Sequence, residues 1–267
     1  MNAERQQTSN GTPIWIRGNG PSVILAHGVL MDHRMWQPQV DALCARFRVC
    51  CYDMLGHGEA PLPPDNPGLD DYVAQTAEVV EHLREFGQPV LGGFSMGGLI
   101  TQAYAATHHA GLRGVMILNA VYDRSPEQST IVRSRSDEMR AGGPAAALDS
   151  ARRRWFTEDD FRQRADAVSD ILSWIEAGDF APKTKAHRVF SRGDADVTGT
   201  LGEISCPALV MTGEDDAGST PEMARKIAAA IPTAELHILP GQRHMMTVLD
   251  AARVNDMLLR FLTHIVR

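Results

Sequence analysis

Six short apolar runs constrain the fold of this chain more than any other feature. They occupy residues 22–27, 48–53, 89–94, 114–119, 207–212 and 235–240. Each run is apolar along most of its length, which is typical of strands buried on both faces. Between them, residues 36–47, 72–86, 96–107, 221–231 and 248–265 have apolar side chains at helical spacing. Alternating strands and helices predict an α/β fold with a doubly wound, mostly parallel sheet.

One long interval, residues 125–203, lacks a convincing strand. It carries three amphipathic stretches, at 126–140, 144–156 and 158–178, separated by glycine and proline. We expect a helical cap here, inserted into a core formed by residues 1–124 and 204–267. A chain of 267 residues that is 43% hydrophobic can bury one large core.

Charge and composition limit the partners of the chain. The formal net charge is −7, and no Lys/Arg run exceeds Arg152–Arg154, which disfavours nucleic acid and anionic membranes. The N-terminus is polar, and no segment reaches the roughly 18 apolar residues of a membrane span. The four cysteines lack metal-ligand spacing, so we expect reduced thiols. These features predict a cytoplasmic protein that binds a small molecule, and they leave its oligomeric state open.

The segment "GFSMG", residues 93–97, places one serine between an apolar strand and a helix. This is the setting of a G-x-S-x-G nucleophile elbow, in which Ser95 is held on a sharp, strained turn. The flanking glycines lack Cβ atoms and therefore let other backbone pass closely. Free N–H groups at the helix start favour a developing negative charge. The pattern predicts that Ser95 is a nucleophile.

A serine hydroxyl needs a general base, and the base needs a carboxylate to orient it. The chain has an acidic loop, "GEDDAG", after the strand at 207–212 and His244 in a loop after the strand at 235–240. Ser95, an acid and His244 thus follow the chain order Ser, Asp, His. Within the acidic loop, Asp216 competes with Glu214 and Asp215. Asp123, just after the strand at 114–119, is a further candidate acid.

The motifs together resemble the α/β-hydrolase superfamily over nearly the whole chain. "AHG" at 26–28 and "YDMLGHGEA" at 52–60 are similar to its oxyanion-loop and D-x-x-G-H-G motifs. The resemblance implies that Asp216, which matches a G-x-x-D pattern counted from Gly213, is the acid. It also implies that the amides of Val29 and Met96 form an oxyanion hole.

Within that superfamily, three segments resemble the 3-oxoadipate enol-lactonase branch and its carboxylesterase relatives. They are "HGVLMDHRMWQPQVDAL" at 27–43, "GFSMGG" at 93–98 and "RRRWFTEDDFR" at 152–162. The resemblance implies a serine hydrolase that cleaves an ester or an (enol-)lactone through an acyl-enzyme. The alternatives are a C–C bond hydrolase of a vinylogous β-diketone, a cofactor-free haloperoxidase-like perhydrolase and a non-catalytic ligand receptor.

Substrate-binding candidates come from the expected cap. Arg152, Arg153 and Arg154 lie about 100° apart on a helix, so they cannot all face one way. Arg154 is our candidate for a substrate carboxylate, because the enol-lactonase resemblance implies an anionic substrate and a guanidinium binds carboxylate in a bidentate way. The alternative is that these arginines lie on a solvated face of the helix. Trp155 and Trp174 are candidates to line the pocket, with core packing as the alternative.

We expect no cofactor and no metal. The chain has no G-x-G-x-x-G after its first apolar run, no P-loop lysine and no H-E-x-x-H.

Overall fold

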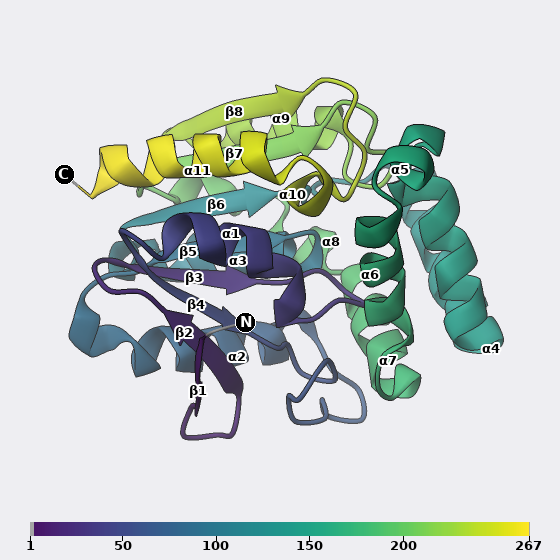
Figure 1. Cartoon of the computed structure of the whole chain (residues 1–267), viewed down its shortest axis with the longest axis horizontal. Coiled ribbons are helices and arrows are strands. Elements are labelled where there is room, and N and C mark those ends of the chain that lie inside the picture. The colour runs from purple at the N-terminus through teal and green to yellow at the C-terminus, as the bar shows by residue number, and fades with distance from the viewer. Residues whose placement is uncertain (1–2, 267) are drawn as a thin grey trace.

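The structure, a computed structural model, describes residues 3–266 and contains one eight-stranded sheet (Figure 1). The strand order is β1-β2-β4-β3-β5-β6-β7-β8. The strands are β1 (Glu4–Gln7), β2 (Pro13–Arg17), β3 (Ser22–Ala26), β4 (Arg48–Tyr52), β5 (Val90–Phe94), β6 (Gly114–Leu118), β7 (Ala208–Gly213) and β8 (Ala234–Leu239). β3 to β8 are parallel to one another. The six predicted strands form within one residue of their expected ends, and the predicted α/β fold class is confirmed.

Two antiparallel strands at one edge of the sheet were not predicted. β1 pairs with β2, and β2 pairs with β4. The four residues of β1, "ERQQ", are all polar and mostly exposed, so they carry no apolar pattern. An edge strand such as β1 is held by backbone pairing rather than by burial, and hydropathy alone does not reveal it. β2, by contrast, buries Ile14 and Trp15.

Helices cover both faces of the sheet. Figure 1 shows α1 and α11 together on one face, with α2 and α3 on the other. The core helices are α1 (Gln37–Leu43), α2 (Leu69–His82), α3 (Met96–His108), α9 (Pro221–Ala230), α10 (Met246–Leu249) and α11 (Ala251–Ile265), and the short 3₁₀ helices are η1 (His33–Trp36), η2 (Arg84–Phe86), η3 (His109–Gly111) and η4 (Leu201–Glu203). The helix predicted at 36–47 is shorter, and the one at 248–265 is divided between α10 and α11.

Further helices gather at the end of the sheet toward which the parallel strands point (Figure 1). They are α4 (Pro126–Trp155), α5 (Glu158–Gln163), α6 (Ala165–Glu176), α7 (Phe180–Phe190) and α8 (Asp194–Val197). Ser125 caps α4 by accepting a hydrogen bond from the Gln128 amide, and Gly143, with φ of 63°, kinks it. The stretches predicted at 126–140 and 144–156 are therefore the two arms of α4. α7 was not predicted, and the proposed boundaries of the cap stay a prediction.

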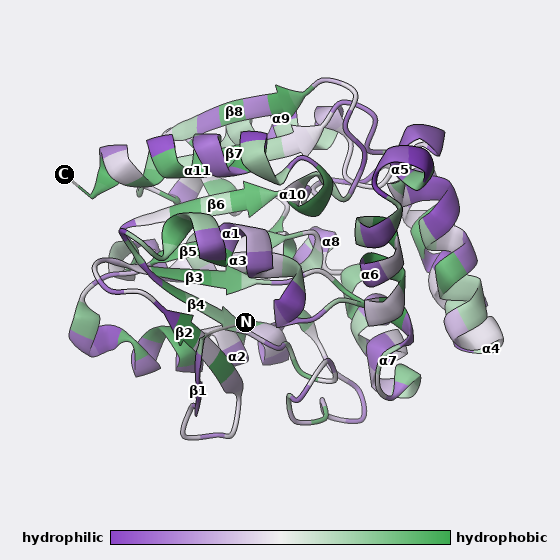
Figure 2. Ribbon diagram, in the orientation of Figure 1, coloured by the Kyte–Doolittle hydropathy of each residue, from purple (hydrophilic) through white to green (hydrophobic). Residues whose placement is uncertain are grey.

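The hydrophobic residues concentrate in the sheet. Figure 2 shows largely hydrophobic parallel strands, whereas the surrounding helices alternate between hydrophobic and hydrophilic residues. Cys44, Cys50, Cys51 and Cys206 are free thiols. Within residues 3–266, no helix combines the length and the hydropathy needed to span a membrane.

Candidate active site

Ser95 lies on a strained turn between β5 and α3. Its φ is 55°, a left-handed value that non-glycine residues rarely adopt. A Cβ at Gly97 would overlap the carbonyl oxygens of Ala26 and His27, and one at Gly93 would overlap the carbonyl of Gly97. The two glycines therefore let β3, β5 and the start of α3 pack closely around the serine.

Three side chains from the ends of three parallel strands form one hydrogen-bonded chain. His244 Nε2 lies 3.1 Å from Ser95 Oγ, and His244 Nδ1 lies 2.7 Å from Asp216 Oδ2. All three residues are buried. Asn119, at the end of β6, donates its Nδ2–H to the same Asp216 oxygen at 2.9 Å. The loops after β5, β7 and β8 thus bring together the three residues that the sequence singled out.

The Asp216 carboxylate is held in its charged form. Burial alone would raise its pKa, but His244 and hydrogen bonds from Ser219 N–H and the Asn119 side chain hold that pKa below its ordinary value. Gly218 N–H donates to Oδ1 as well, at 2.9 Å. Asp123, the rival acid, instead forms an ion pair with Lys226 at 2.8 Å. The geometry therefore favours Asp216 as the partner of His244.

Two backbone amides beside Ser95 are available to a ligand. Among residues 3–266, no acceptor is recorded for the N–H of Val29 or of Met96, whereas neighbouring Gly97 donates to the His27 carbonyl. The loop that carries Val29 is itself strained, since Leu30 has a φ of 71°. Leu30 N–H donates to His57 Nε2 at 3.1 Å, which fixes this loop.

Two buried histidines hold the loops around these amides. His27 Nε2 accepts from Met54 N–H at 2.9 Å, and its Nδ1 lies 2.8 Å from the Gly28 carbonyl. Burial lowers the pKa of His27 and lowers that of His57 well below its ordinary value. Both rings therefore stay neutral and act as fixed links between the loops after β3 and β4.

A cavity of about 90 Å³ opens beside Ser95 and His244. Its walls come from the loops of the sheet and from α4 and α7. Trp155 lines it, with its ring centroid 5.5 Å from that of His244, and so does Arg154. Trp174 lies on α6 outside this lining and is only partly buried, so its role in substrate binding stays a prediction.

Three arginines share this cavity: Arg124, Arg135 and Arg154. Arg124 is neutralised by Asp194 at 2.7 Å, in a pair that is buried on both sides. Burial and the nearby Arg135 lower the pKa of Arg154 to about 10, and burial lowers that of Arg135. Among the described residues, neither side chain forms an ion pair or hydrogen bond. Asp216 offsets part of the charge of Arg154, and Glu138 part of that of Arg135, but neither carboxylate is in direct contact.

Sequence reasoning missed Arg124, Arg135 and the buried His187 of α7, all of which line the cavity. Arg135 stands two residues from exposed Arg133 on a helix whose apolar pattern is weak. Only the packing of α4 against α7 distinguishes the inward arginine from the outward one. No local signal in the sequence marks it.

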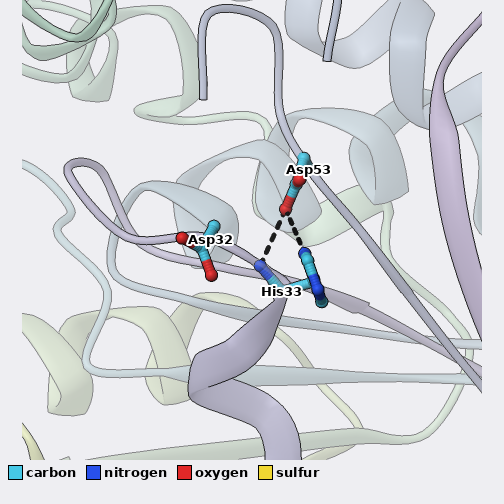
Figure 3. A group of neighbouring side chains, drawn as sticks. All are labelled: Asp32, His33 and Asp53. Carbon is cyan, nitrogen blue, oxygen red and sulfur yellow. Dashed lines mark hydrogen bonds and ion pairs between the residues drawn. The ribbon is translucent and has the colours of Figure 1, made fainter. Parts of the chain in front are cut away.

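A second cluster, Asp32, His33 and Asp53, has the composition of a metal site (Figure 3). Asp53 Oδ1 accepts from the His33 amide at 2.8 Å and lies 2.9 Å from the His33 ring, and Oδ2 accepts from Glu59 N–H. The Arg34 side chain donates hydrogen bonds to both carboxylate oxygens of Asp32. These hydrogen bonds join the loops after β3 and β4, so a structural role explains the cluster.

Comparison with known proteins identifies the family of the chain. Residues 23–257 match the model of the alpha/beta hydrolase family. The chain belongs to that family. Among curated relatives, this hydrolase is 30% identical over 240 residues to an (E)-2-((N-methylformamido)methylene)succinate hydrolase of Acinetobacter baylyi, covering 90% of this chain and 89% of the relative.

Two solved structures extend the likeness to the whole fold. A thermophilic esterase from Thermogutta terrifontis, solved with malate bound, is 28% identical with a TM-score of 0.86, and the match covers 98% of this hydrolase and 99% of the esterase. An enol-lactonase from Burkholderia xenovorans LB400 is 27% identical with a TM-score of 0.86, covering 97% and 100%. The resemblance to the enol-lactonase and esterase branch is confirmed.

Proposed function

We propose that this enzyme is a serine hydrolase that cleaves a carboxylic ester or lactone through an acyl-enzyme. The observation that carries the proposal is the chain from Asp216 through His244 to Ser95 Oγ, at 2.7 and 3.1 Å, at the wall of a cavity. A neutral His244 whose Nδ1–H is held by a carboxylate presents a basic Nε2 to the serine hydroxyl.

The steps follow from these positions. Ser95 Oγ attacks the substrate carbonyl carbon while His244 Nε2 takes the hydroxyl proton. The amides of Val29 and Met96 donate to the resulting oxyanion, a contribution of roughly 3–4 kcal/mol per donor in comparable sites. His244 returns the proton to the leaving oxygen. Water, deprotonated by His244, then attacks the carbonyl of the acyl-enzyme, and His244 returns that proton to Ser95 Oγ as the acid is released.

We also propose that the substrate carries a carboxylate bound by Arg154 and Arg135. Two guanidinium groups without an ion-pair partner in a small cavity repel each other, and an anion relieves that repulsion. One curated relative is named for a succinate substrate, and one similar esterase was solved with malate bound. Both molecules are carboxylates.

Labelling with a fluorophosphonate, followed by a substrate panel, tests the reaction. We expect Ser95 to be labelled in the wild-type protein and not in Ser95→Ala, with turnover of esters or lactones. Turnover of β-diketones alone would favour C–C cleavage, and peroxide-dependent oxidation alone would favour a perhydrolase. Absence of both labelling and turnover would favour a ligand receptor.

The role of Arg154 has its own test. Arg154→Met should raise KM for a carboxylate-bearing ester by tenfold or more, about 1.4 kcal/mol, because a charge-assisted hydrogen bond is lost. The matched neutral methyl ester should respond little. Exposed Arg152, two residues before Arg154 and about 200° from it around the helix, supplies the control variant Arg152→Met. Equal effects of Arg154→Met on both substrates would contradict anion binding at this site.

A further inference from the structure

His187 is a buried polar residue of the cavity that the proposed reaction does not use. It lies on α7, lines the same cavity as Ser95, and only 4% of its surface is exposed. Its ring meets Phe190 edge to face, with centroids 5.9 Å apart. Nδ1 is enclosed by protein and has no hydrogen-bond partner, and among residues 3–266 no partner is recorded for Nε2.

The surroundings of His187 keep the ring uncharged. Burial, together with Arg135, Arg154 and Arg124, lowers its pKa to about 3. Two carboxylates near these arginines already have partners: Asp194 is paired with Arg124, and Asp216 is hydrogen-bonded to His244. A fourth positive charge beside three guanidinium groups would be unfavourable. His187 therefore offers one N–H donor and one lone pair, and the protein uses neither.

The position of the proton follows from the cost of leaving groups unpaired. A buried N–H without an acceptor is rarer and more costly than an unpaired acceptor. Nδ1 is sealed by protein atoms, so a proton there would have no acceptor. The proton is better placed on Nε2, the nitrogen through which the ring can reach a ligand in the cavity. In this tautomer His187 selects hydrogen-bond acceptors.

We propose that His187 is a specificity-determining residue that donates Nε2–H to a carboxylate oxygen of the substrate. This inference rests on the proposed function for the presence of a carboxylate beside Arg135 and Arg154. It adds a neutral donor to the two charged ones. A carboxylate has about four lone-pair sites, so it can accept from all three side chains. A substrate with an apolar or donor group in that position would leave Nε2–H unpaired.

Binding of butyrate, measured by calorimetry, tests the donor. His187→Met should weaken butyrate binding tenfold or more, because an uncharged thioether replaces a donor to an anion. His187→Gln, whose amide nitrogen can reach the position of Nε2, should bind within about threefold of the wild type. His264→Met, at an exposed position on α11, is the matched control. Thermal unfolding checks that each variant is folded.

Nitrogen NMR of ¹⁵N-histidine-labelled protein tests the tautomer separately. The His187 signals, assigned by their loss in His187→Gln, should show Nε2–H and no titration between about pH 5 and 8. Butyrate should shift Nε2 more than Nδ1. A charged ring, a proton on Nδ1 or unchanged butyrate affinity in His187→Met would overturn the proposal. So would a lack of saturable butyrate binding by the wild type.

Neither measurement requires turnover. If Ser95 is not labelled while butyrate binding depends on His187, the hydrolase assignment fails and the donor role stands. If Ser95 is labelled while His187→Met binds butyrate normally, the donor role fails and the hydrolase assignment stands.

Discussion

Replacement of Asp216 by asparagine tests the site most directly, because four hydrogen bonds to this carboxylate are defined. Oδ2 accepts from His244 and Asn119, and Oδ1 accepts from the amides of Gly218 and Ser219. Asparagine has one oxygen and one NH₂ group. Whichever way the side chain is turned, its NH₂ must face two donors.

The two orientations differ in cost. With NH₂ toward Gly218 and Ser219, two buried amides lose their acceptor. With NH₂ toward His244, only the Asn119 donor is left unpaired, at about 1–3 kcal/mol, because the imidazole can move its proton from Nδ1 to Nε2. The second orientation is therefore favoured. It places Nε2–H toward Ser95, where the ring can no longer accept the serine proton.

We expect Asp216→Asn to lower kcat by about 10⁴, or roughly 5.5 kcal/mol, as in other triads whose base is held in the wrong tautomer. Pre-steady-state acylation by p-nitrophenyl acetate would measure the loss, and urea unfolding would measure the smaller effect on stability. Asp123→Asn, which breaks an ion pair with Lys226 away from the site, should change kcat less than tenfold. Near-normal acylation by Asp216→Asn, or an equal loss in Asp123→Asn, would refute the assignment.

Three further outcomes follow from the same contacts. Ser95→Ala and His244→Ala should each remove most of kcat, and the double variant should be little worse than either, whereas additive losses would contradict a shared role. Gly97→Ala should destabilise the fold in urea unfolding, because its Cβ would overlap two carbonyl oxygens of the β3 end, and wild-type stability would contradict that packing. The pKa of His187 is lowered to about 3, so the stability from its neutral ring is complete above about pH 6.5 and is lost as the pH falls toward 3. Between about pH 4 and 6, the free energy of unfolding should therefore rise with pH less steeply in His187→Gln than in the wild type, by about 1.4 kcal/mol per pH unit. An unchanged slope would show that the ring is charged in the folded protein.

The sheet was predictable because burial on both faces leaves a mark in the sequence. β3, β5, β6 and β7 are buried along their whole length and β4 along most of it, so each is a short apolar run. β8, at the other edge, is mostly half-buried and was recognised from Leu236, Ile238 and Leu239. β1 leaves no such mark, since its polar residues face solvent and its stability comes from pairing with β2. α7 was missed because its buried face includes the polar residues Lys183 and His187, which interrupt the apolar pattern, and because it packs against the distant α4.

The same distinction between local patterns and long-range packing applies to the candidate site. The contact between Ser95 and His244 was predictable because the elbow has a local steric requirement and because parallel strands end at one edge. Arg154 was singled out among three consecutive arginines, and the structure places Arg154 in the cavity with Arg152 and Arg153 exposed. His187 was not predictable, because its burial among arginines is produced by packing between helices that are distant in the sequence.

A net charge of −7 disfavours extended anionic partners, but it does not disfavour a small anionic substrate. Charges on the surface act over roughly 8 Å at physiological ionic strength, so the surface acids are largely screened from the cavity. Inside it, Arg135 and Arg154 are screened much less, and the lining contains no Asp or Glu among the described residues. A long polyanion must meet the surface, whereas a small carboxylate meets only the cavity. The sign of the net charge of the molecule therefore does not determine the sign of the charge in its binding site.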